Sequence, residues 1–386
     1  MGSGGANVRA LRPPSSLDEA DVLLARALQR QPKSRGELAQ ETGWSRNTVA
    51  AKVGRLMDEG WVVETGDGRG DRGRPFVRYA LNSAAALVFL ARFDAEGIDA
   101  AVCTLAGDLV AAERHDLGAD LEPERAVDQL AQLLDAMATR PGLDRRRIRA
   151  MVVGVPGPVS GRRRTVPWSK VGVLPADLAE RFGMAVAVEN DANLMALGAR
   201  HEHLDVDSLL FLLVQTGIGA GLVLSGRLHR GLSGWAGEVG HIPVEAAKDR
   251  PCSCGNRGCL ALVAANPALM RAISTPARPV NTVADLKRLV QSGDIDAIMA
   301  LRQAGRHIGE AIVGLVVGAA PELIAVGGHI AEIGDHVITG IRETLAQKTP
   351  PPISSQIRIV ATQDHDRAAV RGATDLAFDL LFPAAR

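Results

Sequence analysis

Two stretches of the chain repeat one pattern, and this repeat constrains the fold more than any other feature. Residues 93–110 read FDAEGIDAAVCTLAGDLV, and residues 213–230 read LVQTGIGAGLVLSGRLHR. Each stretch combines an apolar strand, a tight turn that contains glycine, a second strand and a Leu-x-Gly-x-Leu turn. Two matching hairpins predict a duplicated lobe within an α/β protein.

Apolar strands with polar or glycine-rich ends lie between the two hairpins. Residues 148–159 read IRAMVVGVPGPV and residues 184–200 read MAVAVENDANLMALGAR. Since binding sites of α/β folds are built at such strand ends, we expect a site here.

The first 60 residues predict a leader and three helices. Residues 1–16 are rich in Gly, Ser and Pro and predict a disordered leader without the apolar run that export requires. Gly43 is expected to end the second helix, and Ser45 to cap the third. Capping boxes are expected before the first two helices, formed by Ser16 with Glu19 and by Ser34 with Glu37.

A hairpin with a basic tip follows these helices. Strand-like segments WVVET and FVRYAL flank the loop GDGRGDRGRP, so residues 17–82 predict a winged helix-turn-helix. A packing or dimerisation module is the alternative. DNA binding is favoured because Arg46 and Asn47 open the third helix away from its apolar face, where side chains read base edges. The DNA-binding residues that we predict are Ser45, Arg46, Asn47, Lys52, Arg72 and Arg74.

The charge balance limits where DNA can bind. The chain carries 44 basic and 44 acidic side chains, so any surface that attracts DNA must be local. Residues 72–75, RGRP, resemble the short element that enters narrow A·T-rich minor grooves.

No membrane segment is expected. The most apolar stretch, residues 311–328, contains Pro321 and Glu322 and predicts a buried helix followed by a buried strand. We therefore expect a cytoplasmic protein.

Three of the four cysteines lie within eight positions and predict a metal site. Cys252, Cys254 and Cys259 form C-x-C-x4-C with glycines between them, and tetrahedral zinc requires a fourth ligand. The best candidate is His241, although spacing does not exclude His201, His203 or His229. Three structural or redox thiols are the alternative. Cys103, in a strand, is expected to be a core residue.

These motifs together resemble the ROK family, which combines bacterial sugar-responsive repressors with sugar kinases. The motifs occur in the family's order over nearly the whole chain: GVPGPV, ENDAN, TGIGAGLVLSGRLHRG, AGEVGH and CSCGNRGCL. The resemblance implies two ribonuclease-H-like lobes of the actin and hexokinase type that close over a sugar. They would form one domain of residues 86–386, with lobes near 86–200 and 205–386 and a C-terminal helix that returns to the first lobe.

The resemblance also implies roles for single residues. In the family, the residues matching Glu238 and His241 contact the sugar, and the His also ligates a structural zinc with the three cysteines. Asn190 and Asp191 match a hydrogen-bonding pair on the opposite lobe, where the Asp is the general base of the kinases. The alternatives are that Asn190 only caps a helix and that Glu238 is a solvated carboxylate.

One hairpin argues against kinase activity. Kinases of this family hold phosphate in a D-x-G-G-T turn, whereas this chain has DAEGI, with Glu96 and Ile98 replacing a Gly and the Thr. A carboxylate beside the phosphates repels them. We therefore expect a sugar-responsive repressor that is not an enzyme. The alternatives are a sugar kinase with an added DNA-binding domain, and a DNA-binding regulator whose sugar site is vestigial.

The expected partners are a palindromic operator in double-stranded DNA, a sugar or sugar-derivative effector, and further copies of the chain in a homodimer or homotetramer. One departure from the family bears on the effector. Sugar-binding members have a Glu after G-C-L or G-C-I, and this chain has Ala261 there.

Overall fold

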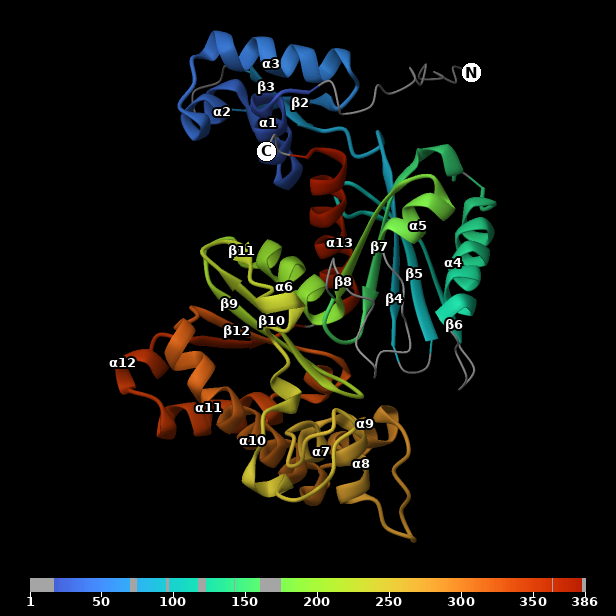
Figure 1. The fold of residues 1–386 in the computed structure, drawn as a ribbon. Coiled ribbons are helices and arrows are strands. Elements are labelled where there is room, and N and C mark those ends of the chain that lie inside the picture. Colours follow the sequence, from blue (N-terminus) through green and yellow to red (C-terminus); the bar gives the residue numbers. More distant parts are fainter. Residues whose placement is uncertain are drawn as a thin grey trace.

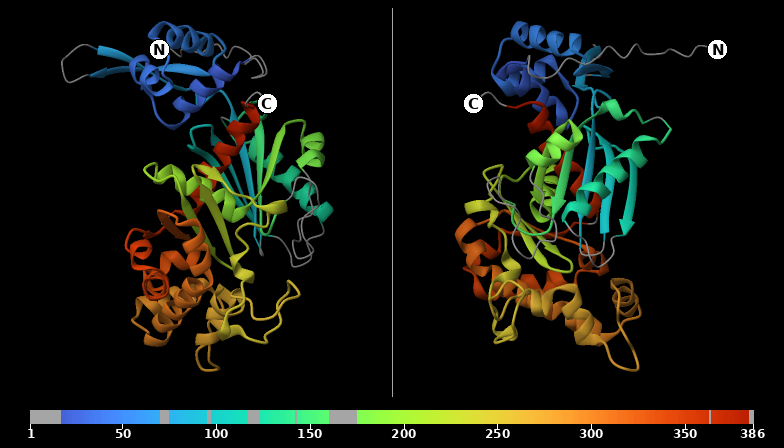
Figure 2. Two further views of the ribbon diagram at one scale, coloured as in Figure 1. Left: turned by 60° about the vertical axis from the view of Figure 1, so that its left-hand side comes forward. Right: turned by 45° about the vertical axis from the view of Figure 1, so that its right-hand side comes forward.

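The structure is a computed structural model that describes residues 17–69, 75–94, 97–116, 123–141, 143–159, 175–362 and 364–383. A small N-terminal module lies at one end of the molecule, above two lobes that are each built on a sheet (Figures 1 and 2). Glu96, Arg72 and Arg74 lie outside the described residues.

The N-terminal module contains three helices and a small sheet. Its helices are α1 (Glu19–Arg30), α2 (Arg35–Thr42) and α3 (Arg46–Asp58). Its strands β1 (Lys33–Ser34), β2 (Val62–Arg69) and β3 (Pro75–Leu81) pair in the order β1-β3-β2. Strand β2 therefore continues into the segment that we predicted as loop.

The caps of α2 and α3 follow the prediction, and the cap of α1 does not. Ser34 and Glu37 form the expected capping box, Gly43 adopts a left-handed φ of 72°, and the Ser45 side chain accepts the Thr48 N–H. The capping box of α1 is formed by Asp18 and Asp21, so the prediction for Ser16 and Glu19 is wrong. An Asp at the N-cap serves the same exposed N–H groups and lies directly before the helix.

The two lobes confirm the sequence repeat. The sheet of lobe 1 has the order β6-β5-β4-β7-β8, and the sheet of lobe 2 has the order β11-β10-β9-β12-β13. In each sheet the first three strands are antiparallel and the last two are parallel to the middle strand. The bounds are β4 Leu87–Phe93, β5 Gly97–Thr104, β6 Leu109–Asp116, β7 Ile148–Val155, β8 Ala185–Asn190, β9 Leu209–Val214, β10 Ile218–Leu224, β11 Arg227–Leu228, β12 Leu323–Gly327 and β13 Arg358–Ala361.

Helices cover both faces of the lobe 1 sheet. Alternate side chains of β4 face opposite layers: Phe89 and Phe93 pack with α4 (Pro123–Ala138) and α5 (Pro175–Phe182). Val88 and Leu90 pack on the other side with α6 (Asp191–Glu202) and α13 (His365–Leu381). Cys103 is fully buried in this second layer, as predicted.

The outer face of the lobe 2 sheet is covered by a layer of helices (Figure 1). These are α7 (Ala261–Ala264), α8 (Asn266–Ile273), α9 (Val283–Gln291), α10 (Ile295–Ala319), α11 (His336–Lys348) and α12 (Pro351–Ser354). The stretch 311–328 is the end of α10 followed by β12; the strand is buried as predicted, whereas the end of the helix is only partly buried and Val317 is exposed. No helix within the described ranges is long and apolar enough to cross a bilayer.

Glycines let α6 and α13 approach backbone to backbone. A Cβ on Gly198 of α6 would lie 1.8 Å from the Ala368 carbonyl oxygen, and a Cβ on Gly372 of α13 would lie 1.9 Å from the Leu194 carbonyl oxygen. Helix α6 also approaches lobe 2 closely, because a Cβ on Gly221 of β10 would lie 2.5 Å from the Ala192 carbonyl oxygen. Helix α6 thus lies between both sheets and against α13.

Substitution of Gly372 by Ala should therefore destabilise the protein. The added methyl group would force apart two helix backbones that have no flexible side chain to yield, at a cost of at least ~2 kcal/mol. We expect Gly372→Ala to lower the thermal unfolding midpoint in calorimetry. Gly314→Ala is the matched control, since this exposed glycine of α10 has open space around it and should gain up to ~1 kcal/mol of helix propensity. Equal midpoints for the two variants would contradict the close crossing.

Candidate functional site

The candidate site begins where β8 passes into α6. Asn190 is the N-cap of α6: its Oδ1 accepts the Asn193 N–H at 3.0 Å, and its Nδ2 donates to the Gly157 carbonyl oxygen at 3.0 Å. The residue is buried. The capping role that we considered as an alternative is therefore present, and a ligand contact through the amide stays a prediction.

Two carboxylates from different lobes, Asp191 and Glu238, lie near enough for the charge of one to act on the other. Burial raises the pKa of Asp191 to about 6, and Asp191 Oδ1 accepts the Ala192 N–H at 2.8 Å. Burial and then the charge of Asp191 raise the pKa of Glu238 to about 7. The pair offers hydrogen-bond acceptors in a poorly hydrated place, which suits a neutral ligand rich in hydroxyl groups.

Glu189 links the two lobes, a role that the sequence analysis did not assign to it. We call its contacts with Asn190, Asn193 and Arg230 the clasp. Its Oε1 accepts the Asn190 N–H and Asn193 Nδ2, both at 3.0 Å, while its Oε2 binds the Arg230 guanidinium at 2.7 Å. Glu189 is buried in lobe 1, and Arg230 follows β11 of lobe 2. The clasp fixes the start of α6 relative to lobe 2.

The cysteine cluster includes His241, as predicted. Ligand atoms of His241, Cys252, Cys254 and Cys259 all lie within 4.8 Å of one another. His241 Nδ1 lies 3.6 Å from Cys252 Sγ, and Cys254 Sγ lies 3.6 Å from Cys259 Sγ. Ligands at tetrahedral zinc, with Zn–S near 2.3 Å, lie about 3.5–3.8 Å apart. Three thiols and one imidazole at these separations fit a closed, structural zinc site.

The loop that carries the cysteines owes its shape to two glycines. Gly255 and Gly258 adopt positive φ values of 92° and 83°, which side chains with a Cβ disfavour. Between them, Arg257 donates to the Asp249 carbonyl oxygen at 2.7 Å. These turns bring Cys254 and Cys259 together.

His241 connects the cysteine cluster to the carboxylates. Its Nδ1 faces Cys252, and its Nε2 lies 3.9 Å from Glu238 Oε2. An ion bound through Nδ1 would hold the imidazole ring and so orient the group that faces Glu238.

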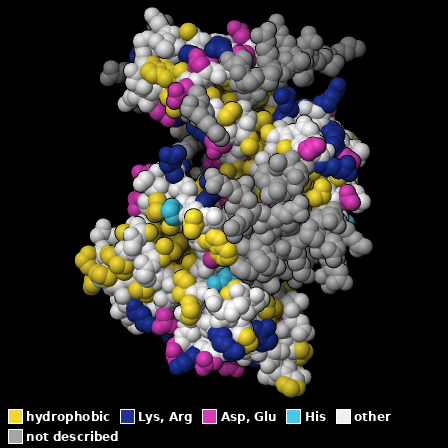
Figure 3. All heavy atoms as spheres, in the orientation of Figure 1, with side chains coloured by type: hydrophobic (Ala, Val, Ile, Leu, Met, Phe, Trp, Pro, Cys, Tyr) yellow, Lys and Arg dark blue, Asp and Glu magenta, His cyan; other side chains and the backbone are white. Residues whose placement is uncertain are grey.

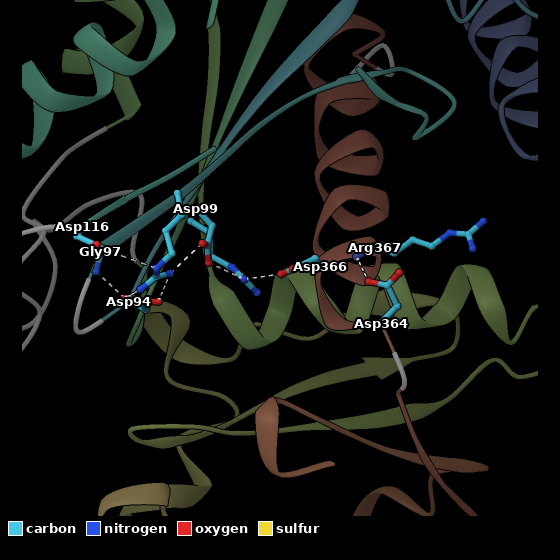
Figure 4. A network of polar contacts seen from close by, with 9 residues as sticks. Asp94, Gly97, Asp99, Asp116, Asp364, Asp366 and Arg367 are labelled. Carbon is cyan, nitrogen blue, oxygen red and sulfur yellow. Dashed lines mark hydrogen bonds and ion pairs between the residues drawn. The ribbon is translucent and has the colours of Figure 1, made fainter. Parts of the chain in front are cut away.

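The first hairpin turn is already occupied by contacts within the chain (Figure 4). Asp94 Oδ1 accepts the Gly97 N–H at 2.7 Å, and Arg114 pairs with Asp94 at 2.9 Å and with Asp99 at 2.8 Å. Ile98 is fully buried. A backbone donor that would face a phosphate is thus used by Asp94.

The ion-pair network continues from this hairpin to the last helix. Arg92 pairs with Asp99 at 2.9 Å and with Asp366 of α13 at 2.8 Å, while Asp364 caps α13 by accepting the Arg367 N–H at 2.8 Å (Figure 4). Since α13 follows β13 of lobe 2 directly, the network fastens the end of lobe 2 to lobe 1.

The predicted DNA-binding residues of the helix-turn-helix differ in their surroundings. Ser45, Arg46 and Asn47 are exposed at the start of α3. Lys52 instead pairs with Asp18 and, at 3.2 Å, with buried Asp21. Its charge is paired within the module, and the DNA contact predicted for Lys52 stays a prediction.

Charges of both signs are interspersed over the described surface, without one dominant field, on the face that Figure 3 shows. This agrees with the zero net charge and leaves any DNA-binding surface local.

Comparisons with known proteins agree with this architecture. The sequence model of the ROK family matches residues 94–379. The chain is 27% identical over 368 residues to a xylose repressor of Bacillus spizizenii, covering 93% of this chain and 94% of the relative. It is 26% identical over 363 residues to the DNA-binding transcriptional dual regulator NagC of Escherichia coli, covering 88% and 87%.

Solved structures share the fold. A ROK family transcriptional regulator, a homologue of the E. coli MLC protein, superimposes with a TM-score of 0.77 at 22% identity, over 95% of this chain and 98% of the other. A ROK family glucokinase from Streptomyces griseus, in complex with glucose and AMPPNP, gives 0.64 at 24% identity over 75% and 99%. The predicted fold class is confirmed.

The geometry of the cysteine cluster yields a prediction about metal content. Freshly purified protein should hold close to one zinc per chain by elemental analysis, and Cys254→Ser should release it because three ligands seldom hold a structural ion. Asn256→Ala, an exposed change in the same loop, should keep the zinc. Protein that contains no zinc when prepared without chelators would refute the metal site.

Proposed function

The chain belongs to the ROK family, and we propose that it is a DNA-binding transcriptional repressor that controls carbohydrate-related genes in response to a sugar or sugar derivative. One observation carries this proposal: a helix-turn-helix module with exposed Arg46 and Asn47 is joined to the two-lobed fold on one chain. The xylose repressor aligns with 93% of the chain, so the likeness extends beyond the family model into this module.

The proposal divides the chain as the sequence suggested. Residues 17–82 would bind DNA, and residues 86–386 would sense the sugar and oligomerise, with lobes near 86–200 and 205–386. In a homodimer or homotetramer, pairs of α3 helices would enter successive major grooves of a palindromic operator. Ser45, Arg46 and Asn47 would contact the DNA first, and Arg72 and Arg74 would reach the minor groove.

The effector would bind between the lobes, contacting Asn190, Asp191, Glu238 and His241. Acceptors from both lobes converge there, and zinc held by His241, Cys252, Cys254 and Cys259 would fix the His241 ring. The ion has a structural role in this proposal because four protein ligands leave no open coordination position. We further propose that the protein is cytoplasmic and does not contact a membrane.

A sugar kinase with an added DNA-binding module is the second candidate, since Asp191 matches the general base in the motif of the family's kinases. The first hairpin argues against it, because Asp94 accepts the Gly97 N–H and Arg114 occupies Asp94. Sugar-dependent ADP release that Asp191→Asn abolishes would favour the kinase over the repressor.

Base readout by α3 is tested with a duplex that the full-length protein selects from a random library. Arg46→Ala should weaken binding of this duplex roughly 5- to 150-fold in a gel-shift titration at fixed salt, since a bidentate contact to a base contributes about 1–3 kcal/mol. Arg146→Ala, an exposed arginine of lobe 1, should bind like the parent. Parent-like binding by Arg46→Ala would remove the recognition role of α3.

Effector affinity is tested at Ala261, the first residue of α7, two positions after Cys259. A hydrogen bond to a charged group contributes roughly 1.5–3 kcal/mol, so Ala261→Glu should tighten binding of a hexose or amino sugar by about ten- to a hundredfold in calorimetry. The sugar is chosen by a thermal-shift screen of the parent. Unchanged affinity in folded, zinc-loaded Ala261→Glu protein would mean that position 261 does not face the ligand.

A further inference from the structure

The helix-turn-helix module is joined to lobe 1 by a short, ordered link. Strand β3 ends at Leu81 and β4 begins at Leu87. Asn82 donates its N–H to the Trp61 carbonyl oxygen at 2.7 Å and its Nδ2 to the Gly60 carbonyl oxygen at 2.8 Å. Ala85 and Ala86 are buried. The link is therefore part of the packed structure and not a flexible tether.

The C-terminal end of α13 forms a second attachment to the module. Trp61 lies edge-on to Phe382 at 4.8 Å between ring centroids, and Phe382 stacks on Phe378 at 4.4 Å. All three side chains are buried, and they belong to one hydrophobic cluster that runs from α1 into lobe 1. Such an aromatic contact has a defined geometry and a large buried area.

Arg26 of α1 completes this second attachment. Its guanidinium lies 4.0 Å from the centroid of the Phe378 ring and forms ion pairs with Asp379 and, at 3.8 Å, with Asp375. Asp375 Oδ2 also lies 2.9 Å from Nε2 of His201 on α6. Arg26 is therefore held by cation–π and ionic contacts to a helix that is itself locked on α6.

Two attachments restrain the module more than either does alone. A single link permits rotation about its own axis, whereas a second contact away from that axis blocks the rotation. Relative motion is the default for domains unless their interface is large and hydrophobic, and here the core is continuous across the interface. Figures 1 and 2 show the module beside the C-terminal end of α13 in all three views.

We propose that Arg26, Phe378 and Phe382 are positioning residues that hold the module in one orientation on lobe 1, and thereby fix the spacing at which two copies of α3 meet DNA. This inference rests on the proposed function. None of the three residues needs to touch DNA. Their effect is on which half-site spacing the protein accepts, and α6 connects the same contacts to Asn190 and Asp191.

The test measures binding of full-length protein to duplexes that differ only in half-site spacing. Two inserted base pairs rotate one half-site by about 70°, at 10–10.5 base pairs per turn. The parent should bind the selected spacing at least ~20-fold more tightly than the extended one. Arg26→Ala should reduce this ratio below ~5-fold. A parent without spacing preference, or an Arg26→Ala protein with the parent's ratio, would overturn the proposal.

Arg35→Ala is the matched control, because Arg35 forms a cation–π contact with Tyr79 inside the module, at 5.2 Å. This variant loses the same kind of contact and the same charge without touching α13. It should keep the parent's spacing ratio, even if its overall affinity falls. A reduced ratio for Arg35→Ala as large as that for Arg26→Ala would assign the effect to loss of charge and overturn the positioning role.

A measurement without DNA separates this inference from the proposed function. In calorimetry of the parent, the module should unfold together with lobe 1, and Phe382→Ala should release it as a separate transition at lower temperature. A separate module transition in the parent would refute the rigid attachment. If the parent selects no duplex from the library, the DNA-binding proposal fails, and the calorimetry still decides whether the module is fixed.

Discussion

The backbone contact between α6 and α13 is the constraint on which the rest of the structure depends. Gly198 and Gly372 let the two helices cross without intervening side chains, so both fit in the layer between the sheets of lobes 1 and 2. Helix α6 starts at the carboxylates Asp191 and Glu238, and α13 starts at the Arg92 ion pair and ends under the N-terminal module. A thicker helix layer would move the carboxylates, the Arg92 ion pair and the N-terminal module apart.

Local features were predictable from the sequence. The hairpin repeat correctly predicted a duplicated lobe, because strand, turn and strand are encoded within about twenty residues, and the structure adds that the two sheets have the same strand order. Ser34 and Ser45 cap helices as predicted, since a cap depends on a few adjacent residues. The error at Ser16 has the same local origin: Asp18, two residues later, also satisfies the rule and lies at the actual helix start.

The candidate site was predictable only where its residues are neighbours in sequence or match a family motif. The cysteine spacing indicated a metal site, and the structure adds which histidine completes it. Glu189 pairs with Arg230, 41 positions away, and Arg92 pairs with Asp366, 274 positions away. The hydrophobic pattern of a sequence does not indicate which residues so far apart will pair. Lys52 is a similar case: the sequence predicted a DNA contact for it but did not indicate its ion pair with buried Asp21, 31 residues earlier in the chain.

The position of α13 also affects how the N-terminal module packs during synthesis. The module precedes α13 in the chain, so Trp61 stays without its aromatic partners until Phe378 and Phe382 are translated. A nascent or prematurely ended chain therefore exposes an apolar face on an otherwise folded module, which is the kind of surface that chaperones and proteases bind. Only a chain that includes α13 can bury this face, and the fold thereby makes the packing of the N-terminal module depend on synthesis of α13.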